Sequence, residues 1–365
     1  MAYVALITDT HFGWKNDSLA FQDYFKRFYD DIFFPELERR HIKTIIHLGD
    51  LFDRRKFINF HILNRTRTDF LERLMPYQTH IMVGNHDTYF RDSNHVNAVR
   101  ELVEDRYDNI SVYEEPQEIT IDGLRILIMP WLNPTNMGSG LEMITNSTAS
   151  VLMGHLEIAG FKMDQTQVSD HGLDKSIFDK YKKVFSGHFH HASEDGAIRY
   201  LGAPYEYTFA DLNDPKGFYI FDTDTLELEF IRNPYDMFNR VIYDDRENAE
   251  ALLDYNFSQH EGKIVRAVIV NKVNPVIYDQ WLDRMNQANP LELLIKEQLS
   301  LDISEDADEQ FSDFETAEDG KVVVSDTLTI LNTYIDSMGM EIDKDKMKRI
   351  LRELYIEAAA LTGEN

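Results

Sequence analysis

Over the first 235 residues, short β-branched runs alternate with longer stretches in which apolar residues recur at helical spacing. A continuous apolar run of a few residues is typical of a buried strand. Apolar residues that recur every three or four positions are typical of a helix that packs one face against a sheet. The alternation therefore predicts βαβ units that feed a buried sheet. The predicted strands are Tyr3–Thr8, Thr44–Leu48, His80–Val83, Ser150–Met153 and Lys183–Ser186, and the predicted helices include Leu19–Arg40 and Ile58–Leu74.

Other segments have the pattern of antiparallel strands. Asp122-Gly123 separates EITI from LRILIM, which predicts a hairpin. Three further strands, expected to be antiparallel, are Ala197–Leu201, Gly217–Phe221 and Leu226–Ile231. The sheet is therefore expected to be mixed, or to be split into two packed layers. The fold class predicted for residues 1–235 is α/β (α+β), a layered β-sandwich flanked by helices.

The pattern changes after Asn233-Pro234. Residues 236–299 are expected to form a small α/β accessory domain, with a strand at Val265–Val270 and a helix at Tyr278–Asn286. Residues 300–324 are crowded with acids, which predicts a solvated linker. Residues 325–365 are expected to form a helical hairpin, and one helix carries an apolar stripe at three- and four-residue steps that is typical of an interface.

Charge restricts the choice of partners. The chain has 37 Lys and Arg against 64 Asp and Glu, a formal net charge of −27. A freestanding nucleic-acid binder usually has a basic surface that displaces counterions from phosphates, so this charge argues against one. Bound divalent cations, or the basic surface of a partner subunit, could offset the objection.

The chain contains no cysteine, which excludes disulfides, thiolate zinc sites and a cysteine nucleophile. A metal site must therefore be built from His, Asp, Glu and Asn. The sequence has no run of 18 apolar residues and begins without a recognisable signal peptide. A soluble, cytoplasmic protein without a membrane anchor is expected, in the host cytoplasm if the gene belongs to a phage.

Five short polar motifs each follow a predicted strand. They are Asp9-Thr10-His11, Gly49-Asp50-Leu51-Phe52-Asp53, Gly84-Asn85-His86-Asp87, Gly154-His155 and Gly187-His188-Phe189-His190. Ligand sites in open α/β sheets lie at the carboxyl ends of strands, so the five loops could converge on one site. A single motif such as Gly-His is near background, and a lone histidine is more often a structural residue. The ordered set of five instead predicts a site for borderline or hard divalent ions.

These motifs resemble the calcineurin-like metallophosphoesterase family, and within it the double-strand-break repair nucleases that include SbcD-like proteins and tailed-phage recombination endonucleases. The resemblance covers about residues 1–235. The finer match rests on Ile7-Thr-Asp-Thr-His-Phe-Gly13, the Gly-Asp-Leu-Phe-Asp segment, Met-Pro-Trp after the hairpin and Leu-Gly-Ala-Pro after the last strand. It implies a capping domain at 236–299. It also implies that residues 325–365 dock on the coiled-coil base of an ABC-type, SMC-like ATPase.

The resemblance also implies a ligand set for two divalent ions, most readily Mn²⁺, with Mg²⁺ as the alternative. One ion would be held by Asp9, His11, Asp50 and His190, and the other by Asp50, Asn85, His155 and His188. Asp50 would bridge the ions. A shared carboxylate keeps two ions about 3.5 to 4 Å apart, and a metal-bridging hydroxide would be the nucleophile.

Three further residues receive roles from the resemblance. His86 follows the asparagine ligand and would contact the scissile phosphate and protonate the leaving oxygen. Asp53 resembles the second aspartate of the phosphatase motif G-D-x-x-D-R-G, which orients that histidine, and Arg54 resembles its phosphate-binding arginine. Arg55 stands where the motif ends in glycine, so this sequence departs from the pattern there.

The leading hypothesis is therefore a manganese-dependent DNA exo- or endonuclease subunit of a recombination or break-repair complex, with DNA and the ATPase as partners. A homodimer remains open. Two alternatives also stay open. One is a phosphoprotein phosphatase or small-molecule phosphodiesterase, which Asp53-Arg54 and the acidic charge favour. The other is a non-catalytic scaffold of an ATPase complex, which has no need of the full ligand set.

Overall fold

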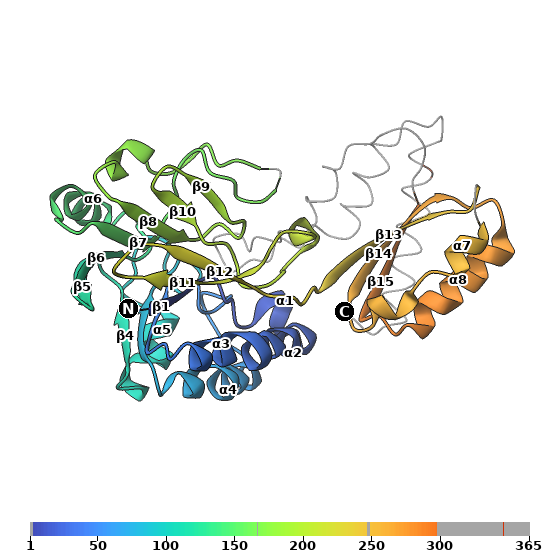
Figure 1. The fold of residues 1–365 in the computed structure, drawn as a ribbon, viewed down its shortest axis with the longest axis horizontal. Helices are drawn as coiled ribbons and strands as arrows, with labels where there is room; N and C mark the ends of the chain where they lie inside the picture. Colours follow the sequence, from blue (N-terminus) through green and yellow to red (C-terminus); the bar gives the residue numbers. More distant parts are fainter. Residues whose placement is uncertain (1–2, 166, 247–248, 298–345, 347–365) are drawn as a thin grey trace. The chain divides into compact units, whose positions relative to one another are not determined.

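The computed structural model describes residues 3–165, 167–246, 249–297 and 346 (Figure 1). The predicted acidic linker and almost all of the predicted helical hairpin lie outside these residues. The described residues up to 297 belong to one compact unit, Met1–Leu299. None of the helices in the described part of the chain is long and apolar enough to cross a membrane.

The first of two six-stranded sheets contains the N-terminal strands. Its order is β12-β11-β1-β2-β3-β4, and β1 to β4 run parallel. On the other side β11 pairs antiparallel with β1, and β12 pairs antiparallel with β11, as predicted. The bounds are β1 Tyr3–Ile7, β2 Thr44–His47, β3 Gln78–Met82, β4 Ile110–Tyr113, β11 Gly217–Asp222 and β12 Leu228–Arg232.

The second sheet has the order β5-β6-β7-β8-β10-β9. Its bounds are β5 Gln117–Ile121, β6 Leu124–Met129, β7 Val151–His155, β8 Lys183–Gly187, β9 Ser193–Asp195 and β10 Ile198–Tyr200. The predicted hairpin at Asp122-Gly123 joins β5 to β6. The antiparallel prediction for 197–201 holds for one of the two neighbours of this strand, β10. The strand is antiparallel to β9 but parallel to β8, because β9 lies between β8 and β10 in sequence and takes the edge position.

The two sheets pack face to face, which confirms the two-layer alternative. One buried cluster between them includes Val4 and Leu6 from β1, Ile128 from β6 and Phe185 from β8. The alternating residues of β1, Ala5 and Ile7, point the other way, into the core beneath the helices. Strands with both faces buried appear in the sequence as continuous apolar runs. The apolar pattern therefore predicted these strands.

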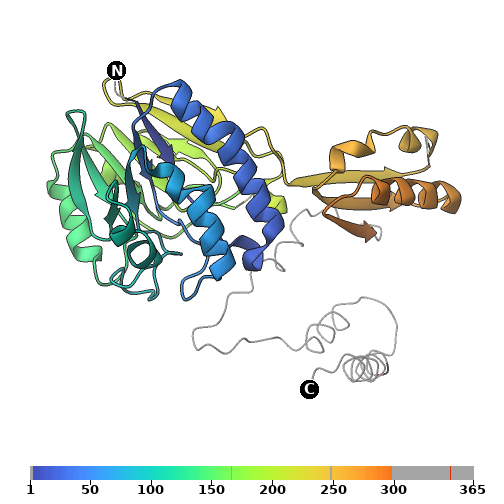
Figure 2. The ribbon, with the colours of Figure 1, turned by 90° about the horizontal axis from the view of Figure 1, so that it is seen from below.

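Helices cover the outer face of each sheet. The blue helices of Figures 1 and 2 are α2 Leu19–Phe28, a five-residue π-helical turn Tyr29–Phe33, α3 Phe34–Arg39 and α4 Phe60–Asp69. The predicted helix at Leu19–Arg40 is thus continuous but contains a π turn. The remaining α-helices of this part are α1 Trp14–Asp17, α5 Ala98–Leu102 and α6 Met137–Asn146.

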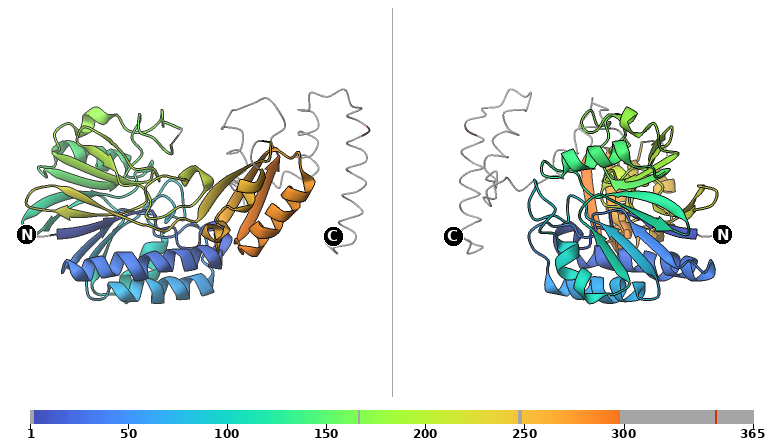
Figure 3. Two further views of the ribbon diagram at one scale, coloured as in Figure 1. Left: turned by 45° about the vertical axis from the view of Figure 1, so that its right-hand side comes forward. Right: turned by 90° about the vertical axis from the view of Figure 1, so that its left-hand side faces the viewer.

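Residues 238–297 form a three-stranded parallel sheet of their own (Figure 3). Its strands are β13 Phe238–Asp244, β14 Ile264–Asn271 and β15 Glu292–Glu297, and its helices are α7 Ala249–Leu253 and α8 Pro275–Gln287. Tyr243, Val265, Trp281 and Met285 lie in its separate core. The strand and helix predicted here are both present. The division at residue 235 stays a prediction.

Candidate metal centre

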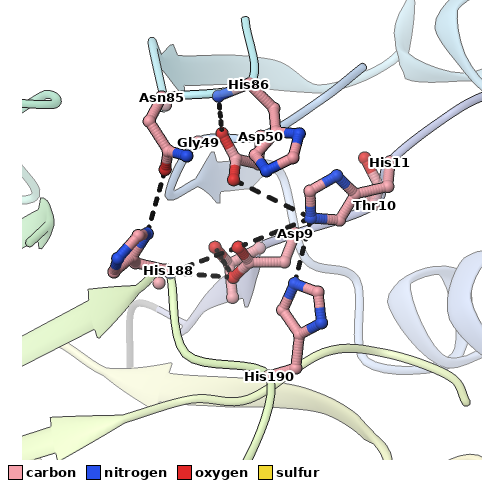
Figure 4. Close-up of polar contacts among 12 residues, drawn as sticks. Asp9, Thr10, His11, Gly49, Asp50, Asn85, His86, His188 and His190 are labelled. Carbon is pink, nitrogen blue, oxygen red and sulfur yellow. Dashed lines mark hydrogen bonds and ion pairs between the residues drawn. The ribbon is translucent and has the colours of Figure 1, made fainter. Parts of the chain in front are cut away.

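The five polar motifs lie in loops that follow parallel strands, and these loops meet in one region. In the first sheet β1, β2 and β3 are parallel neighbours, so the loops after them begin at the same edge. In the second sheet β7 and β8 are parallel neighbours in the same way. The two edges meet in the structure (Figure 4). The sequence-predicted side chains on these loops therefore come together from both layers.

The first group of candidate ligands contains Asp9, His11 and His190. The Nε2 atoms of His11 and His190 lie 3.1 Å apart. His11 Nε2 is 3.9 Å from Asp9 Oδ1 and 3.8 Å from Asp50 Oδ2. These residues are buried or nearly so, and their nitrogen and oxygen atoms face a common point between them.

The second group contains Asp50, His155 and His188, with the amide of Asn85 between the two histidines. Asn85 Oδ1 lies 2.9 Å from His155 Nε2 and 2.9 Å from His188 Nδ1. Asp50 Oδ2 is 3.3 Å from His155 Nε2. The same oxygen atom lies near His11 of the first group, so the position of Asp50 suits the bridging role that the family resemblance implies.

The hydrogen bonds of the site leave acceptors without donors, which fits a bound cation. His155 Nδ1 donates to the carbonyl oxygen of Leu48 at 2.8 Å, so Nε2 is the ring nitrogen that faces Asp50 and Asn85 and that a cation can bind in place of a proton. His11 Nδ1 is buried without a hydrogen-bond partner. Carboxylate, imidazole and amide oxygen that converge in this way suit manganese, iron or zinc. The residues present therefore fit the two ions that the sequence predicted.

The backbone of the ligand loops is strained. Asp9, His11, Asp50 and His188 have φ values of 50°, 41°, 54° and 89°. Non-glycine residues seldom adopt this left-handed region, and when they do they concentrate at functional sites. Hydrogen bonds between the loops hold the conformation. The amides of Thr10 and His11 both donate to the carbonyl oxygen of Asp50, at 3.0 and 3.1 Å.

Two glycines permit the close approach of these loops. A Cβ at Gly49, where φ is 102°, would lie 2.5 Å from His155 Nδ1. A Cβ at Gly84 would overlap the carboxylate and the amide of Asp50. Glycine after these strands thus does more than allow a sharp turn, because any larger residue would displace a candidate ligand.

Asp87 is a supporting residue to which sequence reasoning gave no role, although it belongs to the Gly-Asn-His-Asp motif. Its buried carboxylate accepts backbone N–H groups from Gly84 at 2.9 Å, Phe52 at 3.0 Å and Leu51 at 3.3 Å. These donors belong to the loops that carry Asn85 and Asp50. Asp87 therefore fixes one ligand loop against another, and burial raises its pKa to about 7.

Two tyrosines and a lysine that follow the Leu-Gly-Ala-Pro segment were also missed. Tyr205 donates its hydroxyl to the carbonyl oxygen of Thr10 at 2.7 Å, and Tyr207 donates to that of Asp9 at 2.5 Å. Buried Lys216 donates to the carbonyl oxygen of His190 at 2.7 Å. All three hold the backbone of ligand loops. The available signal was that two tyrosines follow a predicted loop with no amphipathic pattern to explain them.

Burial and the density of charge shift the titration of the ligands. Burial raises the pKa of Asp9 to about 7 and lowers the pKa of His188 to about 3 and of His190 to about 4. Burial acts in the same direction on His155, but the charge of Asp50 overcomes it and raises the pKa of His155 to about 9. Without metal, His155 therefore carries a proton at neutral pH and supplies the cation of the site.

We expect metal binding to release about one proton per chain near pH 8, because a metal that binds His155 Nε2 must displace its proton. The affinity should rise roughly tenfold per pH unit between pH 7 and 9, since the raised pKa keeps His155 protonated until the pH exceeds about 9. Calorimetry of Mn²⁺ binding in buffers of different ionisation enthalpy measures the proton count. The His155→Gln variant should release fewer protons, and an equal count from both proteins would contradict the assignment.

The three residues with predicted catalytic roles lie beside the ligands. His86 Nδ1 donates to the main-chain carbonyl oxygen of Asp53 at 2.7 Å. The Asp53 peptide oxygen thus accepts from His86, while the Asp53 carboxylate lies 3.8 Å from His11 Nδ1 in a cluster that also includes His86. Arg54 forms an ion pair with Asp17 and stacks over Phe57, 4.6 Å from the ring centre. Its contacts do not include a candidate ligand.

Several known proteins are similar to this chain. A family model described as calcineurin-like phosphoesterase matches residues 2–192, a range that contains every candidate ligand. Exonuclease subunit 1 of Enterobacteria phage T4 is 32% identical over 321 residues, which is 87% of this chain and 88% of that protein. An SbcCD nuclease subunit of Staphylococcus saprophyticus is 27% identical over 86 residues, 22% of this chain and 23% of its own. Among solved structures, a novel archaeal phosphodiesterase aligns with 63% of this chain and 99% of its own, at 16% identity and a TM-score of 0.34.

Proposed function

The chain belongs to the calcineurin-like phosphoesterase family, and from that premise we propose that it is the nuclease subunit of a recombination or break-repair complex and cuts DNA phosphodiesters with two manganese ions. The observation that carries the proposal is the set of seven side chains, from five loops, that forms two groups around Asp50. The similarity to a phage exonuclease subunit over most of both chains supports a nucleic acid as the substrate.

The ligand roles follow the two groups. Asp9, His11 and His190 would hold one ion, Asn85, His155 and His188 would hold the other, and Asp50 would contact both. Bound divalent ions would polarise the phosphoryl oxygens and lower the pKa of water, so that hydrolysis proceeds near neutral pH. The surrounding tyrosines, glycines and Asp87 hold the ligand loops in place.

His86 is the proposed proton donor to the leaving oxygen. Its amide donates to Asp50 Oδ1 at 2.8 Å and its Nδ1 donates to the Asp53 carbonyl oxygen, so the ring is fixed at two points. The Nε2 atom is left to hold the proton that passes to the leaving group. The His86 ring packs edge-on against His11, with ring centres 4.8 Å apart, which places it beside the first group of ligands.

The phosphatase alternative loses its main argument in this geometry. Arg54 was its candidate phosphate-binding group, but Arg54 is paired with Asp17. The net charge of −27 remains, and it gives poor long-range steering toward DNA. We therefore propose that the ATPase partner supplies much of the phosphate contact, and that DNA binding by this chain alone is weak and falls steeply with salt.

We further propose that the partner docks on residues 325–365. Deletion of these residues is expected to leave manganese-dependent hydrolysis of a small phosphodiester near the wild-type rate, because the catalytic loops all lie before residue 192. The same deletion should abolish copurification with the ATPase and the stimulation of DNA degradation by the ATPase. Copurification of the truncated chain, or its unfolding, would reject the docking segment.

A direct test of the function incubates the purified chain with single-stranded DNA, duplex DNA and bis-p-nitrophenyl phosphate. Each reaction is run with Mn²⁺ or Mg²⁺, with and without the ATPase. We expect manganese-dependent cleavage of DNA that increases when the ATPase is added. Turnover of phosphomonoesters or phosphopeptides without cleavage of any DNA would favour the phosphatase alternative.

A further inference from the structure

A hollow of about 190 Å³ lies beside the metal centre and is bounded by the loops that carry its ligands. Phe12 and Phe52, which line it, are paired in a short parallel bridge. Phe12 follows His11, and Phe52 lies between Asp50 and Asp53 in the same loop. Tyr89 lines another wall, three residues after His86. The hollow and the metal centre therefore share three loops.

Exposed aromatic side chains gather at this hollow. Among the residues that the structure describes, the aromatic side chains that are most exposed are Phe57, Phe60, Tyr89 and Phe90, at 65%, 86%, 41% and 49%. All four belong to two short segments, 57–60 and 89–90, and the first member of each segment lines the hollow. Phe90 packs edge-on against Tyr89, with ring centres 4.7 Å apart. Solvent-exposed rings concentrated at one place mark an interaction site.

Positive charge gathers at the same place. Arg54-Arg55-Lys56 is the only run of three consecutive cations in a sequence whose net charge is −27, and all three residues line the hollow. Arg54 stacks over Phe57, and Lys56 Nζ lies 5.8 Å from the ring centre of Tyr89. Cations beside exposed rings are the combination that binds single-stranded nucleic acid, because bases stack on the rings while the cations meet the phosphates. Arg54 is paired with Asp17, which also lines the hollow, so the phosphate contact would come from Lys56 beside Tyr89.

We propose that this hollow, defined by Arg54–Phe57 and Tyr89, binds an unpaired nucleotide of the DNA substrate close to the scissile phosphate. The inference rests on the proposed nuclease function and adds a subsite for single-stranded DNA. The hollow is smaller than the roughly 300–1,000 Å³ of sites that enclose drug-sized ligands, so it suits one flat group rather than a duplex.

The chain itself limits the distance between this subsite and the catalytic residues. Phe57 is the fourth residue after Asp53, and Tyr89 is the third residue after His86. An extended chain of four residues spans at most roughly 14 Å. A base on these rings therefore belongs to a nucleotide only a few positions from the phosphate that is cut. The subsite would favour substrates whose end is frayed or single-stranded.

The test uses the full chain with the double substitution Phe57→Ala and Tyr89→Ala. Binding of labelled oligothymidylate and of a hairpin duplex with the same number of phosphates is measured by fluorescence anisotropy at low salt, with a chelator so that nothing is cut. We expect single-strand affinity to fall roughly tenfold or more, since each stacked base contributes that much, and duplex affinity to change less than twofold. Manganese-dependent turnover of bis-p-nitrophenyl phosphate should stay within twofold.

Two controls make the result specific. Met75→Ala removes a side chain that is 64% exposed, close to the 65% of Phe57, and that does not line the hollow. It should change neither the single-strand affinity nor the duplex affinity. The conservative pair Phe57→Trp and Tyr89→Phe keeps flat rings and should retain single-strand binding. Unchanged single-strand affinity in the alanine variant, or equal losses for single strand and duplex, would overturn the subsite. If the wild-type chain cut no phosphodiester while the variant still lost single-strand binding, the nuclease function would fail and the subsite would stand.

Discussion

Asp50→Ala is expected to lose both metal ions and all measurable hydrolysis, whereas His86→Ala should keep both ions and lose about 10²- to 10⁴-fold in turnover. The contrast arises because Asp50 Oδ2 lies near His11 of one ligand group and His155 of the other, while His86 contacts the site through the Asp53 carbonyl oxygen. Metal content by elemental analysis and turnover of a small phosphodiester give the two readouts separately.

A matched control for these variants is His95→Ala, which removes an exposed imidazole that is not among the candidate ligands. It should leave metal content and turnover unchanged. Two ions per chain in the Asp50→Ala protein would show that the carboxylate does not bridge. Loss of metal in the His86→Ala protein would instead place His86 among the ligands. This outcome is worth measuring because His86 lies close to His11 and Asp53.

Asp87→Ala is expected to lower the free energy of unfolding by about 3 kcal/mol or more. Three backbone N–H groups would lose their acceptor in a buried place, and each unsatisfied donor costs about 1–3 kcal/mol. The corresponding fall in Tm is roughly 6–12 °C. Metal affinity should also fall, because the same hydrogen bonds join the loops of Asn85 and Asp50. Thermal unfolding and metal titration measure the two effects.

Asp87→Asn should fall between the wild type and Asp87→Ala, since the amide keeps one oxygen acceptor but replaces the other with a donor. Asp92→Ala, at an exposed position five residues later, is expected to leave Tm within about 1 °C and to serve as the control. Equal stability of the Asp87→Ala protein and the wild type would mean that the loops are held by other contacts, and the supporting role of Asp87 would be wrong.

The sequence predicted those parts of the site that depend on strands and their ends. Buried parallel strands read as apolar runs, and the Gly-Asp, Gly-Asn-His and Gly-His motifs directly after them were conspicuous because such residues have no packing role there. Parallel pairing then brought Asp9, Asp50 and Asn85 to one edge without further information. The division of the strands between two layers was one of two alternatives, and only the shared buried cluster decided it.

The remaining features depend on contacts between distant segments, which local pattern does not encode. Tyr205 and Tyr207 hold the loop of Asp9 across almost 200 residues, and neither carries a motif. The parallel pairing of β10 with β8 depends on the edge position of β9. The motif does not predict that His86 bonds to the peptide oxygen of Asp53 while the Asp53 carboxylate lies 3.8 Å from His11 Nδ1.

The left-handed backbone of Asp9, His11, Asp50 and His188 has a consequence for the lifetime of the protein in a cell. This conformation costs roughly 1–2 kcal/mol per residue, and the native fold must bear that cost whether or not metal is present. Ions that bind only the folded chain raise its free energy of unfolding by mass action, by about 2.7 kcal/mol for each ion at a concentration 100 times its Kd. The supply of divalent metal would then set how much folded protein survives proteolysis, as well as how fast it works.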